Sequence, residues 1–171
     1  IDGINGLVTG QLLLIVAGIV LLTEAHSNSA ETAQILFALV FAGALAGFLP
    51  FNFPKAKLFL GDVGSVLLGF SCGILVIWMG RKNTELYHIF IPLCGYFFLE
   101  GGITLLRRII AGKRWEQAHR DHFYQRLIRI KWSHQQTSLL IWKVQVLITL
   151  ILWYGIKTQV DYLWFWIVPT V

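Results

Sequence analysis

The sequence has few charged residues and little cysteine. Only 13% of its 171 residues are charged, whereas 56% are hydrophobic, and the mean hydropathy is +0.67. This composition is typical of a membrane protein and excludes most soluble globular classes. The two cysteines, Cys72 and Cys94, both lie inside hydrophobic runs. They indicate small buried side chains rather than a disulfide framework or a zinc site.

The N-terminus lacks the features of a signal peptide. It opens with Ile1 and Asp2, without an initiating Met and without a basic segment before the first hydrophobic run. We therefore expect the chain to be the C-terminal portion of a longer protein.

Long hydrophobic runs dominate what is present. A helix that crosses a bilayer needs about 20 apolar residues, and only helices or closed barrels satisfy the backbone there. Because the runs are continuous rather than alternating, the sequence predicts an all-α, polytopic transmembrane helix bundle of about five to six spans. We expect one integral membrane domain over residues 1–171. The runs are Leu7–Leu22, Ile35–Leu49, Val63–Met79, Leu86–Leu106 and Leu139–Tyr154, with a shorter sixth run at Tyr162–Val171.

The basic residues predict which end of the bundle faces the cytoplasm. If the spans alternate in direction, segments 1–6, 50–62 and 107–138 share one face and hold ten Lys and Arg, against three on the other. The positive-inside rule then makes this face cytoplasmic and makes residues 107–138 a basic cytoplasmic loop. The net charge of +5 is thus a topology signal. We expect no nucleic-acid partner, because no aromatic-interleaved basic pattern is present.

Two polar segments of this face precede hydrophobic runs. The first, "IDGINGL", contains Asp2 and Asn5, which either meet a ligand or cap a helix. The second, "NFPKAKLFLGDVGS", contains Asn52 and Lys57 and places Asp62 where a helix should begin. A carboxylate at a helix N-terminus can hold Mg²⁺ beside a phosphate. Helix capping by Asp62, with lysines that only mark the cytoplasmic side, is the alternative.

The third polar segment is "AHRDHFYQRL". His119 and His122 are three residues apart, so on a helix they would share one face, with Arg120 nearby. Histidine with arginine suits a nucleotide or a diphosphate better than a structural metal. A basic loop attracted to anionic lipid is the alternative.

Glu100 and Lys143 are ionisable residues inside predicted spans, where charges are costly and are usually paired or functional. Both lie at a similar depth from the predicted cytoplasmic face. The sequence therefore suggests an ion pair between Glu100 and Lys143.

The three polar segments together resemble a known family, the polyprenyl-phosphate N-acetylhexosamine-1-phosphate transferases (glycosyltransferase 4 family). "NFPKAKLFLGDVGS" resembles its signature loop, and "IDGINGL" resembles the end of a preceding motif. "AHRDHFYQRL" resembles the histidine motif of the branch that initiates O-antigen and related polysaccharides. The peptidoglycan-precursor branch carries adjacent histidines instead. The resemblance covers the C-terminal half of the family pattern.

The resemblance implies an activity. A sugar 1-phosphate would pass from a UDP-N-acetylhexosamine to undecaprenyl phosphate, with release of UMP, at the cytoplasmic face of a bacterial inner membrane. Mg²⁺, or alternatively Mn²⁺, would be required. Asp62 would be the metal ligand and a catalytic residue, and Asp2 a second catalytic acid. The implied substrate-binding residues are Asn5, Asn52, Lys57, His119, Arg120 and His122.

The sequence also departs from the family pattern. Asn5 stands where many relatives carry Asp, and the adjacent Asp-Asp pair of the family's N-terminal half is absent. We therefore expect the 171-residue chain alone to be inactive. A peptidoglycan-type phospho-MurNAc-pentapeptide transferase, a transporter or channel fragment, and a structural subunit that binds anionic lipid stay as alternatives. The identity of the sugar, and the choice between direct attack and a covalent intermediate, stay open.

Overall fold

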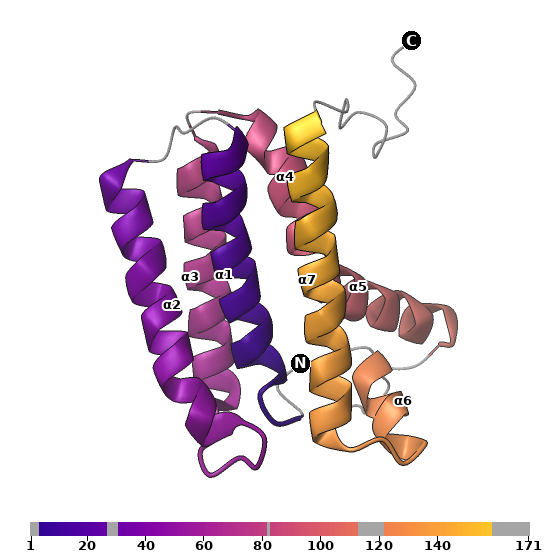
Figure 1. The fold of residues 1–171 in the computed structure, drawn as a ribbon. Coiled ribbons are helices and arrows are strands. Elements are labelled where there is room, and N and C mark those ends of the chain that lie inside the picture. The colour runs from indigo at the N-terminus through magenta and orange to yellow at the C-terminus, as the bar shows by residue number, and fades with distance from the viewer. Residues whose placement is uncertain (1–3, 27–30, 82, 113–121, 159–171) are drawn as a thin grey trace.

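The computed structural model describes residues 4–26, 31–81, 83–112 and 122–158, and it is helical with no strand in these ranges. Figure 1 shows long helices side by side, with the shorter α5 and α6 on one flank. The predicted all-α bundle is confirmed. The helices are α1 (Leu7–His26), α2 (Thr32–Asn52), α3 (Gly61–Gly80), α4 (Glu85–Leu93), α5 (Gly95–Ile110), α6 (Phe123–Arg129) and α7 (His134–Thr158).

Helix α1 is the centre of the bundle. It packs against α2, α3, α4 and α7, and its Ile15, Val16 and Ile19 are fully buried. The outer helices α2, α3 and α7 bury one side in the same core and leave large apolar side chains exposed on the other. Such outward-facing apolar surface is expected where the solvent is lipid.

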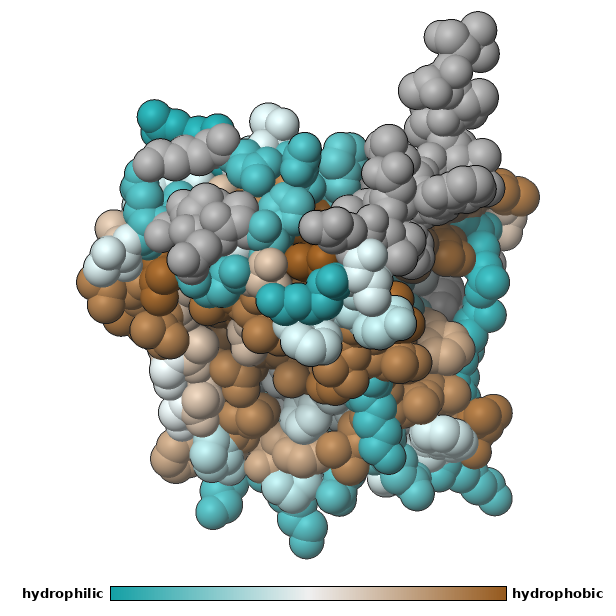
Figure 2. All heavy atoms as spheres, turned by 45° about the horizontal axis from the view of Figure 1, so that its top comes forward, coloured by the Kyte–Doolittle hydropathy of each residue, from teal (hydrophilic) through white to brown (hydrophobic). Residues whose placement is uncertain are grey.

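Four helices, α1, α2, α3 and α7, are long and apolar enough to cross a membrane, and α4 with α5 forms a fifth candidate. Figure 2 shows hydrophobic side chains banding the middle of the visible face, with hydrophilic ones gathered toward its two ends. The five predicted long spans therefore have helical counterparts. The sixth run, Tyr162–Val171, lies outside the described residues.

The fourth predicted span is not one continuous helix. The run Leu86–Leu106 divides at Cys94 into α4 and α5, which are bent by 62°. Pro92 lies at the end of α4, and proline removes a helical hydrogen bond while its ring crowds the preceding turn. As Figure 1 shows, α5 consequently leaves the bundle sideways rather than continuing along it.

The start of α1, the α2–α3 loop and the α6–α7 turn all lie at the same end of the bundle (Figure 1). This agrees with the alternating direction assumed for the predicted topology. Within segment 107–138, predicted as a basic loop, the described residues include the last turn of α5, all of α6 and the first turn of α7.

Candidate active site

Asn52 joins the beginning of α1 to the α2–α3 loop. Its Oδ1 accepts hydrogen bonds from the Gly6 N–H at 3.0 Å and the Thr9 hydroxyl at 3.1 Å, and its Nδ2 donates to the Leu58 carbonyl at 2.9 Å. The residue is 2% exposed. Asn52, predicted to line the substrate site, thus holds together two of the three polar segments.

Gly6 permits this close approach. It has φ +72°, a conformation that L side chains rarely adopt. A Cβ built on it would lie 2.7 Å from the Cβ of Phe53. Phe53 in turn packs its ring 4.7 Å from that of Trp142 on α7. Gly6 therefore allows a tight turn where α1, α2 and α7 meet.

Asn5 extends the same junction to α7. Its Nδ2 donates to the Pro54 carbonyl at 3.1 Å, and its carbonyl accepts from the Ser138 hydroxyl at 2.8 Å. Its Oδ1 lies 3.3 Å from His134 Nδ1. We call Asn5, Gly6, Thr9, Asn52, His134 and Ser138 the N-terminal junction. His134 was not identified from the sequence, since an isolated histidine before a hydrophobic run carries no motif.

The α2–α3 loop presents its charged side chains outward. Lys57 is exposed, while its backbone N–H donates to the Phe51 carbonyl at 2.7 Å. Gly61 has φ +68° and begins α3, and Asp62 follows in the first turn with an exposed side chain. A carboxylate there interacts favourably with the helix dipole and is also open to a ligand. The cap position of α3 is Leu60, and no side-chain hydrogen bond caps the helix, so the alternative that Asp62 is the helix cap is wrong.

His122 is the first residue of the third polar segment that the structure describes, and it directly precedes α6. The Glu100 Oε1 accepts a hydrogen bond from the Phe123 N–H at 2.6 Å and lies 3.3 Å from His122 Nδ1. Glu100 is thus paired with α6, and the suggested ion pair with Lys143 is wrong. Lys143 is exposed on α7. The bend at Cys94 explains the difference, because it turns Glu100 away from the face that a straight helix would present.

The donor set around Asp62 bears on the predicted metal. Among the described residues, no three His, Cys, Asp or Glu side chains lie close enough to hold a metal ion together. Asp62 therefore offers a single exposed carboxylate. This fits Mg²⁺, which keeps several waters and uses one or two carboxylates together with substrate phosphates. It does not fit a structural zinc site, which needs four protein ligands.

Two apolar cavities flank α5. One, of about 430 Å³, lies between α3 and the α4–α5 break and is lined by Ser65, Gly69 and Phe97 among others. The second, of about 560 Å³, lies between α5 and α7, where apolar residues such as Leu99 and Ile103 adjoin Glu100 and Arg107. Both are shaped by apolar side chains with few polar groups, so they suit hydrocarbon rather than a nucleotide.

Comparison with known proteins identifies the family. A family model described as glycosyl transferase family 4 matches residues 1–80. A probable undecaprenyl-phosphate N-acetylglucosaminyl 1-phosphate transferase of Bacillus subtilis (strain 168) is 30% identical over 146 residues, 84% of this chain and 40% of the relative. The chain belongs to glycosyl transferase family 4. The resemblance to this family is thereby confirmed.

Other relatives of this family 4 chain are named phospho-N-acetylmuramoyl-pentapeptide-transferases. A phospho-N-acetylmuramoyl-pentapeptide-transferase of Staphylococcus saprophyticus is 32% identical over 161 residues, 91% of this chain and 47% of the relative. One of Staphylococcus aureus (strain JH9) is 33% identical over 160 residues, 91% of this chain and 46% of the relative. The chain therefore spans less than half the length of the curated relatives it matches.

The predicted site residues of this family 4 chain divide into two groups. Asn5, Asn52, Lys57 and Asp62 lie in or beside the loops at one end of the bundle, and Asn5 and Asn52 are joined through the N-terminal junction. His122 lies at the start of α6. No hydrogen bond or ion pair links Asp62 to His122 within the described residues. Asp2, His119 and Arg120 lie outside the described residues.

Proposed function

We propose that the chain is the C-terminal part of an integral membrane enzyme that transfers a sugar 1-phosphate from a UDP-N-acetylhexosamine to undecaprenyl phosphate. The products would be an undecaprenyl-diphosphate sugar and UMP. The observation that carries the proposal is the exposed Asp62 carboxylate in the first turn of the apolar helix α3. At this residue a polar helix end, which suits phosphate, meets a membrane-spanning segment. A substrate that carries its phosphate on a lipid requires both.

The chain's own residues can hold both substrates. Asp62 would hold Mg²⁺, which supplies charge neutralisation between two phosphorylated substrates that repel each other. Lys57 is an exposed cation in the loop that leads into α3, and its ammonium group can bind phosphate oxygens as a point charge.

The lipid substrate would lie against the apolar side of α5. Its hydrocarbon chain suits the cavity between α3 and the α4–α5 break, which Glu100 does not line, while its phosphate stays with the polar groups at the interface. The N-terminal junction holds the α2–α3 loop against α1 and α7 through hydrogen bonds. The loop that carries Lys57 and leads to Asp62 is therefore fixed in position. Such positioning supplies much of the rate in phosphoryl transfer.

The donor sugar separates two branches of the family. We favour a UDP-N-acetylhexosamine and a role in initiating lipid-linked O-antigen or related polysaccharides, because the segment "AHRDHFYQRL" lacks adjacent histidines. A peptidoglycan-precursor transferase is the second candidate, since relatives of that name are 32–33% identical over 91% of the chain. Supplying UDP-N-acetylglucosamine and UDP-MurNAc-pentapeptide separately to the same membranes distinguishes the two.

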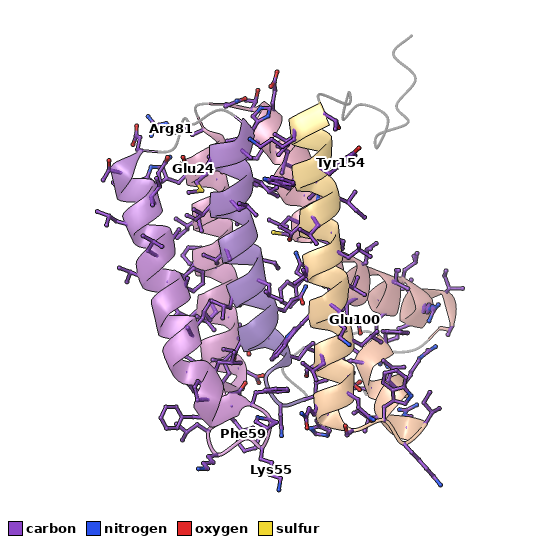
Figure 3. The ribbon with its side chains drawn as sticks, in the orientation of Figure 1. Glu24, Lys55, Phe59, Arg81, Glu100 and Tyr154 are labelled. Carbon is purple, nitrogen blue, oxygen red and sulfur yellow. The ribbon has the colours of Figure 1, made fainter. Side chains whose placement is uncertain are left out.

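The decisive experiment is Asp62→Asn in the complete protein that carries these residues. We expect Mg²⁺-dependent transfer from a radiolabelled UDP-sugar to undecaprenyl phosphate to fall by about a hundredfold or more, because the substitution removes a ligand charge at the transferring phosphates. Glu24→Gln is the matched control, since Glu24 is an exposed carboxylate at the opposite end of the bundle (Figure 3). Equal activity of Asp62→Asn and wild type would mean that Asp62 only interacts with the dipole of α3.

A further inference from the structure

Glu100 is the only buried carboxylate among the described Asp and Glu residues. It lies on α5, six residues beyond the break at Cys94, and its side chain is 6% exposed. Figure 3 labels it on the flank where α5, α6 and α7 meet. A charge in such a position is costly and persists only where it is paired or functional.

The closest polar contacts of Glu100 are with the start of α6. Its Oε1 accepts the Phe123 N–H at 2.6 Å and lies 3.3 Å from His122 Nδ1. The hydrogen bond from Phe123 is charge-assisted, and such bonds are stronger than neutral ones. The His122 ring approaches the same oxygen and forms an ion pair with it when the imidazole is protonated. Glu100 therefore lies where it can hold both the path of the chain into α6 and the His122 imidazole.

A buried side chain of α6, Tyr124, also holds this helix in place. Tyr124 is 2% exposed and packs in a small core with Ile4, Leu7 and Ile141. Its ring stacks on that of His122, with centroids 5.4 Å apart. The His122 ring therefore lies between a buried aromatic ring and a buried carboxylate, and its side chain is 16% exposed.

We propose that Glu100 is a positioning residue, which holds the His122 imidazole and the beginning of α6 in the arrangement that binds the nucleotide sugar. This rests on the proposed function, in which His122 contacts the UDP-sugar. Nothing in the geometry requires Glu100 itself to touch substrate. Its effect should therefore appear in the affinity for the donor and not in the affinity for the lipid acceptor.

The test compares Glu100→Gln and Glu100→Asp with wild type in the complete protein. Gln keeps the size and an acceptor oxygen but loses the charge that faces His122, whereas Asp keeps the charge on a shorter side chain. We expect Glu100→Gln to raise the KM for UDP-N-acetylglucosamine about tenfold, because a charge-assisted contact is lost. The KM for undecaprenyl phosphate should be unchanged, and Glu100→Asp should restore part of the donor affinity.

Glu85→Gln provides a matched control. Glu85 also pairs with a histidine, at 3.2 Å from His26 Nε2, but it is 73% exposed at the other end of the bundle. We expect the donor KM of this variant to equal that of wild type. Size-exclusion chromatography in detergent checks that each variant is folded before its kinetics are compared.

The outcomes separate the two proposals. If wild type transfers sugar phosphate and Glu100→Gln changes the donor KM alone, Glu100 positions the donor site. If wild type transfers and Glu100→Gln lowers only kcat, or changes nothing, Glu100 has a merely structural role and the inference is overturned. If wild type itself transfers nothing from any UDP-sugar, the proposed function fails and the inference fails with it.

Discussion

At the residue scale, Asn52 uses both acceptor directions of its Oδ1 and one N–H of its amide. The three partners are the Gly6 N–H, the Thr9 hydroxyl and the Leu58 carbonyl. A buried amide with this many partners specifies one arrangement of the chain around it, because each partner loses its hydrogen bond if the side chain is removed. Asn52 therefore supports the neighbouring loop that carries Lys57 and Asp62.

Asn52→Ala should consequently destabilise the protein. It leaves three polar groups without this partner, and we expect a loss of about 3 kcal/mol. Thr9→Val removes one of the three hydrogen bonds and should cost about 1 kcal/mol. Thermal unfolding in detergent measures both variants. A normal unfolding temperature for Asn52→Ala together with weakened UDP-sugar binding would show instead that the side chain meets substrate.

Single residues show where sequence reasoning succeeds and where it stops. The costly charge at Glu100 is visible in the sequence, because an acid inside a hydrophobic run demands a partner. Its partner is not visible. Phe123 and His122 follow Glu100 by more than 20 positions, and they reach it only because α5 turns away from the bundle. Depth along a straight span, the basis for choosing Lys143, omits this turn.

At the element scale, the break between α4 and α5 is stabilised from outside. The Phe97 N–H bonds to the Cys94 carbonyl at 3.1 Å, so the Leu93 carbonyl is available to another donor. Gln145 on α7 donates to that carbonyl at 3.0 Å, and its own Oε1 accepts from Gln11 on α1 at 2.5 Å. In a bilayer core, polar groups freed by a break must find partners within the protein. The two glutamines meet this requirement.

Gln145→Leu should therefore weaken the break. The variant removes both interhelical hydrogen bonds, which in membrane proteins contribute on the order of 1 kcal/mol each, so we expect a loss of about 1.5 kcal/mol in stability. Thr149→Val is the control one turn along α7, because within the described residues the Thr149 hydroxyl donates its hydrogen bond to the Gln145 carbonyl of the same helix. Unfolding of both variants in detergent is the measurement, and equal stabilities would contradict this role of Gln145.

The break itself has only a weak signal in the sequence. Proline is tolerated in transmembrane helices where neighbouring groups satisfy the backbone, so Pro92 within Leu86–Leu106 does not by itself predict a divided span. The 62° bend also reflects packing, because α4 lies against α1, α3 and α7 whereas α5 leaves this bundle. Hydrophobic periodicity describes a segment, whereas this packing depends on segments far away in the chain.

At the scale of the whole molecule, composition predicts much more of the structure than it predicts of the break between α4 and α5. The lengths of the hydrophobic runs predict the long helices to within a few residues, because the bilayer thickness fixes how much apolar chain a span needs. The distribution of Lys and Arg further predicts that the end with the α2–α3 loop is cytoplasmic. Lys55 lies at this end and Arg81 at the other (Figure 3).

Cysteine labelling tests that orientation. We expect Lys55→Cys to react with a membrane-impermeant maleimide only after cells are opened, and Arg81→Cys to react in intact cells, because both side chains are exposed at opposite ends. Cys72 and Cys94 should be replaced by alanine in both variants, so that labelling reports the new thiol alone. The reverse pattern would place the α2–α3 loop outside the cytoplasm.

The last prediction concerns the activity of these 171 residues by themselves. Within the described part of the chain, Asp62 is the one exposed carboxylate at the end that holds the α2–α3 loop, and the relatives are more than twice as long. A divalent ion between two phosphorylated substrates is held better by two acidic residues than by one. We therefore expect purified chain, reconstituted with undecaprenyl phosphate, a UDP-sugar and Mg²⁺, to show no transfer, and co-production with the N-terminal half of a family member to restore it. Transfer by the 171 residues alone would mean that the acids within them suffice.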